Sequence, residues 1–434
     1  MIVWNLLIKI DWTNLYYYYL IDICVFMSIL SKRSIHAENP ILEEDITAEM
    51  LKKKGHNVIK LNRGDPPIYF NTPDYIIEAY IDALKEHKTN YTDAIGVAEL
   101  RNAVAERYKR MYKINVNPNN IITTAGVSEA LEFINYGLIN PGDHAIIFKP
   151  YYSAYIPRLL LAGGIPIYEN YYEKENWNID IEHLNASIKN LKKRGKLNRV
   201  KYMIITNPNN PTGTVLKKSV LEDIVDIAND NNILLISDEI YDEIYYNKTK
   251  FTSIGEVAKG IPHVILNGAS KDFDATGFRI GFIIVPEQDK ISREFTNKMA
   301  DFARVRLCVN TPAQYASAAA LNNKKEHDKA IKYMVHEIED RVNYAVSILN
   351  ENKYIETVEP NGAFYIFPKI KHNALKIKND KEFVDRFLRE EYIQLTRGSG
   401  FGKAGYFRIV SLPPKEILDY ALNKLNEFCI RNKS

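Results

Sequence analysis

The chain has 434 residues, of which 46% are hydrophobic and 26% charged, a composition that excludes an intrinsically disordered protein and leaves room for two domains. Its 57 basic and 54 acidic side chains leave a net charge of +3, which gives no electrostatic reason to expect nucleic acid or an anionic membrane as a partner. The cysteines form no CxxC pair, which favours a reducing, cytoplasmic setting without disulfides.

The first 30 residues are apolar and rich in tyrosine, but Lys9, Asp11 and Asp22 interrupt them. A membrane-spanning helix needs about 18 or more uncharged residues in a row, and this segment has no such run. A secretory signal would need a basic start and a small-residue cleavage site, and neither is clear. Three interpretations of residues 1–26 stay open: a wrongly chosen start codon with Met27 as the true first residue, a weak membrane anchor, or an ordered extension.

The next part of the chain alternates helices with loops. Residues 41–56 have helical spacing, and a short strand then breaks into a loop at the sequence GDPP. Residues 78–88 and 97–111 are predicted to form amphipathic helices. We assign residues 27–75 to an N-terminal arm that contributes to a small domain.

From about residue 121 onward, short β-branched strands alternate with helices. This rhythm predicts an α/β fold whose large domain, residues 76–310, has a mostly parallel sheet flanked by helices. A long helix at about 324–350, short strands, and helices at 380–391 and from residue 415 predict a smaller α+β domain over residues 311–434.

Four of the predicted strands end in polar groups. In open parallel sheets, ligands bind outside the carboxyl ends of the strands, so we expect these groups to lie together. They are AGVSEAL at 125–131, NPNNPTG at 207–213, SDEIY at 237–241 and SK at 270–271.

Lys271 lies among small residues between two apolar strands, and a buried lysine needs a chemical reason to be there. Loss of solvation lowers the pKa of a lysine, and the neutral amine can form a Schiff base with a carbonyl. Asp238 ends an apolar strand, where a carboxylate needs a cationic partner. That partner is either a protonated ring nitrogen of a ligand or an arginine in a structural ion pair.

The other strand ends also have two interpretations each. The helix start near Gly126 and Ser128 can bind a phosphate, or Ser128 is an ordinary helix cap. The asparagines at 207–213 can bind a phenolate oxygen, or they form a plain turn. Arg279 can fork onto phosphate oxygens, or it forms a surface salt bridge. Taken together, a phosphate, a protonated ring nitrogen, a phenolate and an aldehyde describe pyridoxal 5′-phosphate (PLP).

With the motifs NPNNPTG, SDEIYDE and NGASK...TGFRIG in this order, the chain resembles the class I/II PLP-dependent aminotransferases from about Ile41 to its end. The resemblance implies the aspartate-aminotransferase fold, which is fold type I of the PLP-dependent transferases. It implies that Lys271 forms the internal aldimine and shuttles a proton, with Asp238 and Tyr241 as further catalytic residues. The cofactor-binding residues that it implies are Gly126, Val127, Ser128, Tyr152, Asn210, Asp238, Tyr241, Ser270, Lys271 and Arg279, and Tyr91 reaching the partner subunit's phosphate in a homodimer.

At one position the chain departs from the family. Many members have a serine where this chain has Gly268, so a hydroxyl contact to the phosphate is absent here. The glycine-rich GSGFGK at 398–403 does not fit a dinucleotide fingerprint, because Lys403 stands where the third glycine belongs. A substrate-entry loop is the expected role of that segment.

The substrate residues implied by the same resemblance are Gly64, Asn210 and Arg408, the last for the α-carboxylate. RVRLCVNTPAQ, GAFYIFPKI, RGSGFG and FRIVSLPP are similar to alanine-aminotransferase-type members, notably archaeal ones. This implies ping-pong transfer of an amino group between an L-amino acid, alanine first, and 2-oxoglutarate. Aspartate as donor, a PLP β-lyase and a non-catalytic PLP-binding regulator stay as alternatives. We expect no metal site, no membrane association and no nucleic-acid partner.

Overall fold

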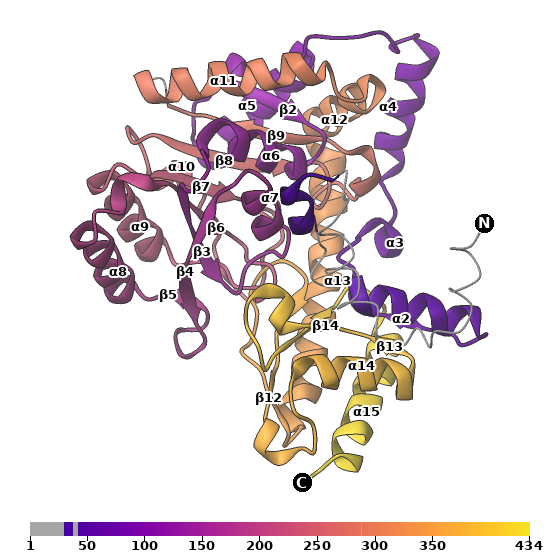
Figure 1. Cartoon of the computed structure of the whole chain (residues 1–434). Helices are drawn as coiled ribbons and strands as arrows, with labels where there is room; N and C mark the ends of the chain where they lie inside the picture. The colour runs from indigo at the N-terminus through magenta and orange to yellow at the C-terminus, as the bar shows by residue number, and fades with distance from the viewer. Residues whose placement is uncertain (1–29, 38–41, 288) are drawn as a thin grey trace, which may run out of the picture.

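The computed structural model describes residues 30–37, 42–287 and 289–434, and Figure 1 shows their arrangement. The three interpretations of residues 1–26 therefore lie outside the described residues. No helix in the described part of the chain is long and apolar enough to cross a lipid bilayer.

An eight-stranded sheet forms the centre of the large domain, in the order β2-β9-β8-β7-β6-β3-β4-β5. The strands β3, β4, β6, β7 and β8 run parallel, whereas β9 is antiparallel to both of its neighbours and β5 is antiparallel to β4. The expectation of a mostly parallel sheet is confirmed. The strand bounds are β2 Ile121–Thr124, β3 His144–Lys149, β4 Ile165–Tyr172, β5 Asn178–Ile179, β6 Val200–Thr206, β7 Leu234–Asp238, β8 His263–Gly268 and β9 Gly281–Ile284.

Successive side chains of each strand lie on opposite faces of the sheet, so its apolar residues pack into two separate cores. Met203 and Ile205 of β6 pack into one core with helices α5, α8, α9 and α12, whereas Tyr202 and Ile204 pack into the other with α6, α7 and α11. Such two-sided burial is typical of parallel strands, because helices cover both faces of the sheet. The helix bounds are α5 Ala98–Tyr112, α6 Val127–Leu138, α7 Tyr155–Leu161, α8 Ile181–Lys193, α9 Lys218–Asp230, α10 Ile254–Val257, α11 Lys290–Arg306 and α12 Thr311–Asn322.

A third core holds the small domain together. In it, β1 (Ile59–Lys60) pairs in parallel with β13 (Ile393–Gln394), which brings the N-terminal arm onto the C-terminal part of the chain. The 28-residue helix α13 runs from the large domain to α15, as Figure 1 shows. The other elements are α2 Leu42–Lys53, α13 Lys324–Glu351, β10 Ile355–Glu356, β11 Tyr365–Ile366, β12 Lys369–Ile370, α14 Asp380–Glu391, β14 Thr396–Arg397, β15 Phe407–Val410 and α15 Lys415–Arg431.

Helix α12 bears on where the two domains divide. It packs against α4 (Asp74–Lys85) and α5, and its buried Ala313, Ala316 and Leu321 belong to the core of the large sheet. A boundary at residue 311 would therefore cut α12 away from its own core. We place the proposed boundary after α12, where α13 begins.

Candidate active site

A cavity of about 750 Å³ opens at the carboxyl ends of β6, β7 and β8, where residues of the small domain also reach it. This is the position that ligands take in open parallel sheets. Most of the residues predicted from the sequence line it, namely Gly64, Val127, Ser128, Tyr152, Asn210, Asp238, Tyr241, Ser270, Lys271, Arg279 and Arg408.

The amine of Lys271 lies inside this cavity and donates a hydrogen bond of 2.6 Å to the carbonyl oxygen of Gly64. Burial lowers the pKa of Lys271 to about 8, although Asp65 opposes this shift, so the amine loses its proton far more readily than a surface lysine. Glycine is required at position 64, because a side chain there would collide with the Phe364 ring and the Tyr365 hydroxyl.

The small residues before Lys271 have a steric cause. A Cβ atom at Gly268 would lie 2.6 Å from the carbonyl oxygen of Ile280 and 2.9 Å from the Cα of Gly281, where the neighbouring strand β9 begins. A serine at position 268 would therefore force the two strands apart. The close approach of these two segments therefore accounts for glycine at position 268 of this chain.

Asp238 ends β7 and is buried. Its carboxylate accepts hydrogen bonds from the Tyr155 hydroxyl at 2.7 Å and from the Ile240 N–H at 3.4 Å. Burial raises the pKa of Asp238 to about 6, although the Tyr155 and Ile240 donors and Lys271 act against it. Within the described residues, Asp238 forms no ion pair, so the alternative of a structural arginine partner is not found there. The carboxylate is thus placed to receive a cation from a ligand.

Tyr241, Asn210 and Arg408 form one hydrogen-bonded chain. The Nη1 of Arg408 donates to Asn210 Oδ1 at 2.8 Å, and Asn210 Nδ2 makes a long contact of 3.5 Å with the Tyr241 hydroxyl. The Tyr241 and Tyr365 hydroxyls are 2.8 Å apart. The guanidinium of Arg408 lies between the rings of Tyr365 and Phe401, with 4.7 Å to each centroid. These contacts fix its orientation, while its buried Nε has no partner among the described residues.

The start of α6 and Arg279 form another edge of the cavity. Gly126 precedes the helix with a φ of 76°, a conformation that favours glycine. A Cβ at Gly281 would collide with the backbone of Gly126 and Val127, so two chain segments meet here without side chains between them. Arg279 donates to the carbonyl oxygens of Thr276 at 2.9 Å and Ala125 at 3.2 Å. It follows a short 3-10 helix, and β9 begins two residues later rather than at Arg279 itself.

Tyr91 lies apart from these residues. It does not line the cavity of its own chain, and its side chain is 78% exposed. Other cavity residues were missed from the sequence, among them Tyr365, Arg63 and Arg158, as was Tyr155, which binds Asp238 from behind the cavity wall. Tyr155 follows the PYY motif by three residues and is the first residue of α7, and this spacing was the available signal.

Comparisons with known proteins agree with this geometry. The family model described as aminotransferase class I and II matches residues 56–425. An aspartate aminotransferase from Thermotoga maritima is 34% identical over 89% of this chain and 95% of that protein, and a glutamate-pyruvate aminotransferase from Escherichia coli K12 is 32% identical over 90% and 94%. The solved alanine aminotransferase from Pyrococcus furiosus superposes with a TM-score of 0.88 at 38% identity, over 93% of this chain and all of that one. The chain belongs to the class I and II aminotransferases.

Proposed function

We propose that this aminotransferase uses PLP held at Lys271, and that it moves an amino group between alanine and 2-oxoglutarate in two alternating half-reactions. The observation that carries the proposal is the buried amine of Lys271, with its lowered pKa, in one cavity with Asp238 and Arg408. An amine in that state is a nucleophile near neutral pH, which a surface lysine is not.

The residues present fit the proposed cofactor. The buried Asp238 carboxylate, with its raised pKa, lacks a cation within the described residues, and a protonated pyridine nitrogen would supply one. The first N–H groups of α6 have no partner inside the helix, and with Ser270 and Arg279 they could hold a phosphate. Tyr152 lines the same cavity and could stack on the ring.

When bound, PLP would supply an aldehyde for amines and a cationic ring that withdraws electrons from the substrate's Cα. Lys271 would then act as a base that takes the proton from Cα and delivers it to the cofactor carbon that carried the aldehyde. Asp238 would keep the ring nitrogen protonated through its charge. Tyr241 and Asn210 would donate hydrogen bonds to the ring oxygen.

Arg408 is proposed to bind the α-carboxylate of every substrate. A guanidinium forms two parallel hydrogen bonds to a carboxylate, and this one is already oriented by Tyr365, Phe401 and Asn210. Its Nε, which has no partner in the described part of the chain, is the donor left over for a ligand. The side chain is buried, so the contact would form away from bulk water, where it is strongest.

Alanine is the proposed donor, and aspartate is the second candidate because the Thermotoga maritima relative carries that name. The acceptor 2-oxoglutarate has a distal carboxylate, so the site needs another cation in one half-reaction whichever donor it uses. Arg63 lines the cavity, its side chain is 59% exposed, and it lies 3.7 Å from Asp45 in a loose ion pair. We propose that Arg63 binds the distal carboxylate of 2-oxoglutarate.

We further propose a cytoplasmic homodimer. Tyr91 is far too exposed for a residue serving its own chain's cavity, and a second subunit could use it at the partner's phosphate. Helix α4, which precedes it, also leaves Ile77, Ile81 and Leu84 exposed on its surface. Analytical ultracentrifugation tests the dimer, and complementation between Tyr91→Ala and Lys271→Ala chains tests the shared site.

The direct test of function is an assay of alanine with 2-oxoglutarate that follows pyruvate. Purified protein should form pyruvate and show an absorbance band of bound cofactor, and Lys271→Ala should lose both. Aspartate replaces alanine in a parallel assay that follows oxaloacetate. Breakdown of cystathionine without any transamination would favour a β-lyase instead.

A further inference from the structure

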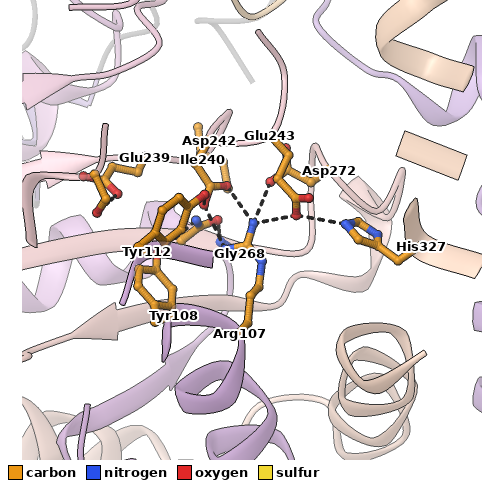
Figure 2. Close-up of polar contacts among 12 residues, drawn as sticks. Arg107, Tyr108, Tyr112, Glu239, Ile240, Asp242, Glu243, Gly268, Asp272 and His327 are labelled. Carbon is orange, nitrogen blue, oxygen red and sulfur yellow. Dashed lines mark hydrogen bonds and ion pairs between the residues drawn. The ribbon is translucent and has the colours of Figure 1, made fainter. Parts of the chain in front are cut away.

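Figure 2 shows a cluster of buried charged residues. Its members Arg107, Asp242 and Asp272 do not line the active-site cavity, but Asp242 and Asp272 each directly follow a residue that does. At its centre is Arg107 of α5, with a side chain that is 4% exposed. Its two terminal nitrogens donate to the two oxygens of Asp242 at 2.8 and 3.0 Å. One of them also contacts Glu243 at 2.7 Å and Asp272 at 3.5 Å. One guanidinium thus joins three carboxylates.

The positions of these carboxylates in the chain connect the cluster to catalysis. Asp242 directly follows Tyr241 in the turn after β7, and Asp272 directly follows Lys271 in the turn after β8. Cα atoms of adjacent residues are about 3.8 Å apart, so a shift of either aspartate moves its neighbour. Each turn sends one side chain into the cavity and the next one to Arg107.

The two aspartates that contact Arg107 differ in their tendency to ionise. Burial and the neighbouring Asp242 raise the pKa of Asp272 well above its usual range, so this carboxyl keeps its proton. Burial opposes ionisation of Asp242 as well, but Arg107 outweighs it and lowers that pKa to about 2. Asp242 also accepts a hydrogen bond of 2.6 Å from Tyr112. The distances agree with this difference, because Arg107 binds both oxygens of Asp242 and contacts Asp272 only at 3.5 Å.

The far side of the cluster is also held. His327, in the first turn of α13, lies 2.9 Å from Glu243, and its ring stacks on Phe273 with centroids 4.4 Å apart. Glu243 thus contacts both Arg107 and α13, which ties the cluster to the start of that helix. Figure 2 shows Arg107 together with Asp242, Glu243 and Asp272.

We propose that Arg107 is a positioning residue, which sets the Tyr241 hydroxyl and the Lys271 amine relative to each other through Asp242 and Asp272. The inference rests on the proposed roles of Tyr241 and Lys271. Stability alone does not explain the cluster, since a buried ion pair is often no more stable than apolar side chains of the same volume. Fixed geometry is what the fork of Arg107 adds.

The test replaces Arg107 by lysine, which keeps the charge but loses the fork over two oxygens. Tyr241 should stabilise negative charge on the cofactor's ring oxygen, which lowers the pKa of the nitrogen of Lys271 that carries the cofactor. A displaced hydroxyl should therefore raise the midpoint of the cofactor's absorbance titration, by about 0.5 units or more. We expect kcat to fall about 10- to 100-fold. The KM for alanine should stay within about threefold, because Arg408 is held by other residues.

Arg341→Lys is the matched control. Arg341 is buried in α13 and pairs with Glu337 at 2.9 Å, far along the chain from either catalytic turn. Arg341→Lys should lower the Tm and leave the titration midpoint and kcat unchanged. Should Arg107→Lys fail to fold, Tyr112→Phe takes its place, since it removes a single hydroxyl from Asp242; its midpoint should rise in the same direction by a smaller amount.

Two results separate the possible failures. A wild-type protein without a cofactor band would refute the proposed function itself. A wild-type band, with a variant of the cluster that loses only Tm as Arg341→Lys does, would show that the cluster is merely structural and would overturn the positioning role.

Discussion

Replacing Lys271 by methionine should stabilise the cofactor-free protein at pH 7. The pKa of Lys271 falls from 10.5 to about 8 on folding, and a shift of about 2.5 units corresponds to about 3.4 kcal/mol. Below pH 8 the amine is protonated in both states, and the folded state bears the whole cost of burying the charge. Water can enter the cavity that the amine lines and screen its charge. We therefore take about 3 kcal/mol as the upper bound of the cost of burying the charged amine. Lys271→Met also loses the hydrogen bond to Gly64, which destabilises the variant by about 1 kcal/mol. The free energy of unfolding should therefore rise by about 2 kcal/mol in total.

The sign of the effect makes the pH dependence diagnostic. The folded-state pKa is lowered, so the wild type gains stability as the pH rises from about 8 towards the unfolded value of 10.5. At pH 9.5 the remaining cost is between about 1 and 2 kcal/mol. The advantage of Lys271→Met should therefore shrink by about half or more between pH 7 and pH 9.5.

Urea unfolding of cofactor-free protein measures this at both pH values. All samples need one protein concentration, because subunit association adds to the apparent stability. Lys218→Met, at a side chain that is 63% exposed, is the control and should change the free energy of unfolding by less than about 0.5 kcal/mol. A difference between wild type and Lys271→Met that is the same at pH 7 and pH 9.5 would refute the claim that the amine is buried at a cost.

Three further outcomes follow from individual contacts. Asp242→Asn should lower the free energy of unfolding in urea by about 3–5 kcal/mol, because it breaks a buried ion pair. Asp272→Asn should lower it by less than about 1 kcal/mol, because the Asp272 carboxyl already holds a proton. Equal losses for the two variants would contradict the assignment of the proton to Asp272. Arg63→Ala should raise the KM for 2-oxoglutarate about tenfold in steady-state kinetics, with alanine as the internal control, and an equal rise for alanine would contradict its role. Tyr155→Phe removes a hydrogen-bond donor from Asp238 and so raises the pKa of Asp238, which is already about 6. Cofactor affinity, measured by fluorescence titration, should therefore fall more at pH 6.5 than at pH 8.5. An equal fall at both pH values would contradict this reasoning.

The parts of the fold that follow from local pattern could be predicted from the sequence. The helices α14 and α15 begin at Asp380 and Lys415 as expected, since their apolar spacing and starts are local signals. The assignment of α12 to the small domain was the weak point. Its alanine-rich segment fits either core, and only the contacts with α4 and α5 decide which one it joins.

The candidate site divides in the same way. Lys271 and Asp238 follow predicted strands, so their place in one cavity was expected from the order of strand ends, whereas Arg408 was expected there only from the family resemblance. Tyr365 stands in GAFYIFPKI and Arg63 directly precedes GDPP, but neither segment indicated a site role for them, because their place in the cavity depends on how the small domain lies against the sheet. Gly268 was read as a lost hydroxyl, whereas the structure gives it a steric role against Ile280.

Arg107 marks the limit of reasoning from sequence. It stands 135 residues from Asp242 and 165 from Asp272, in an amphipathic helix where Arg101 is the other buried charged residue and the remaining charged residues face solvent. A pattern of periodicity assigns an arginine in such a helix to the surface. What distinguishes Arg107 is that the two turns with the proposed catalytic residues Tyr241 and Lys271 each have an acidic residue directly after that residue, and one cation lies within reach of both. Adjacent catalytic and acidic residues in two separate turns therefore indicate a buried cation that holds the turns together, and mutation of that cation should alter chemistry before it alters binding.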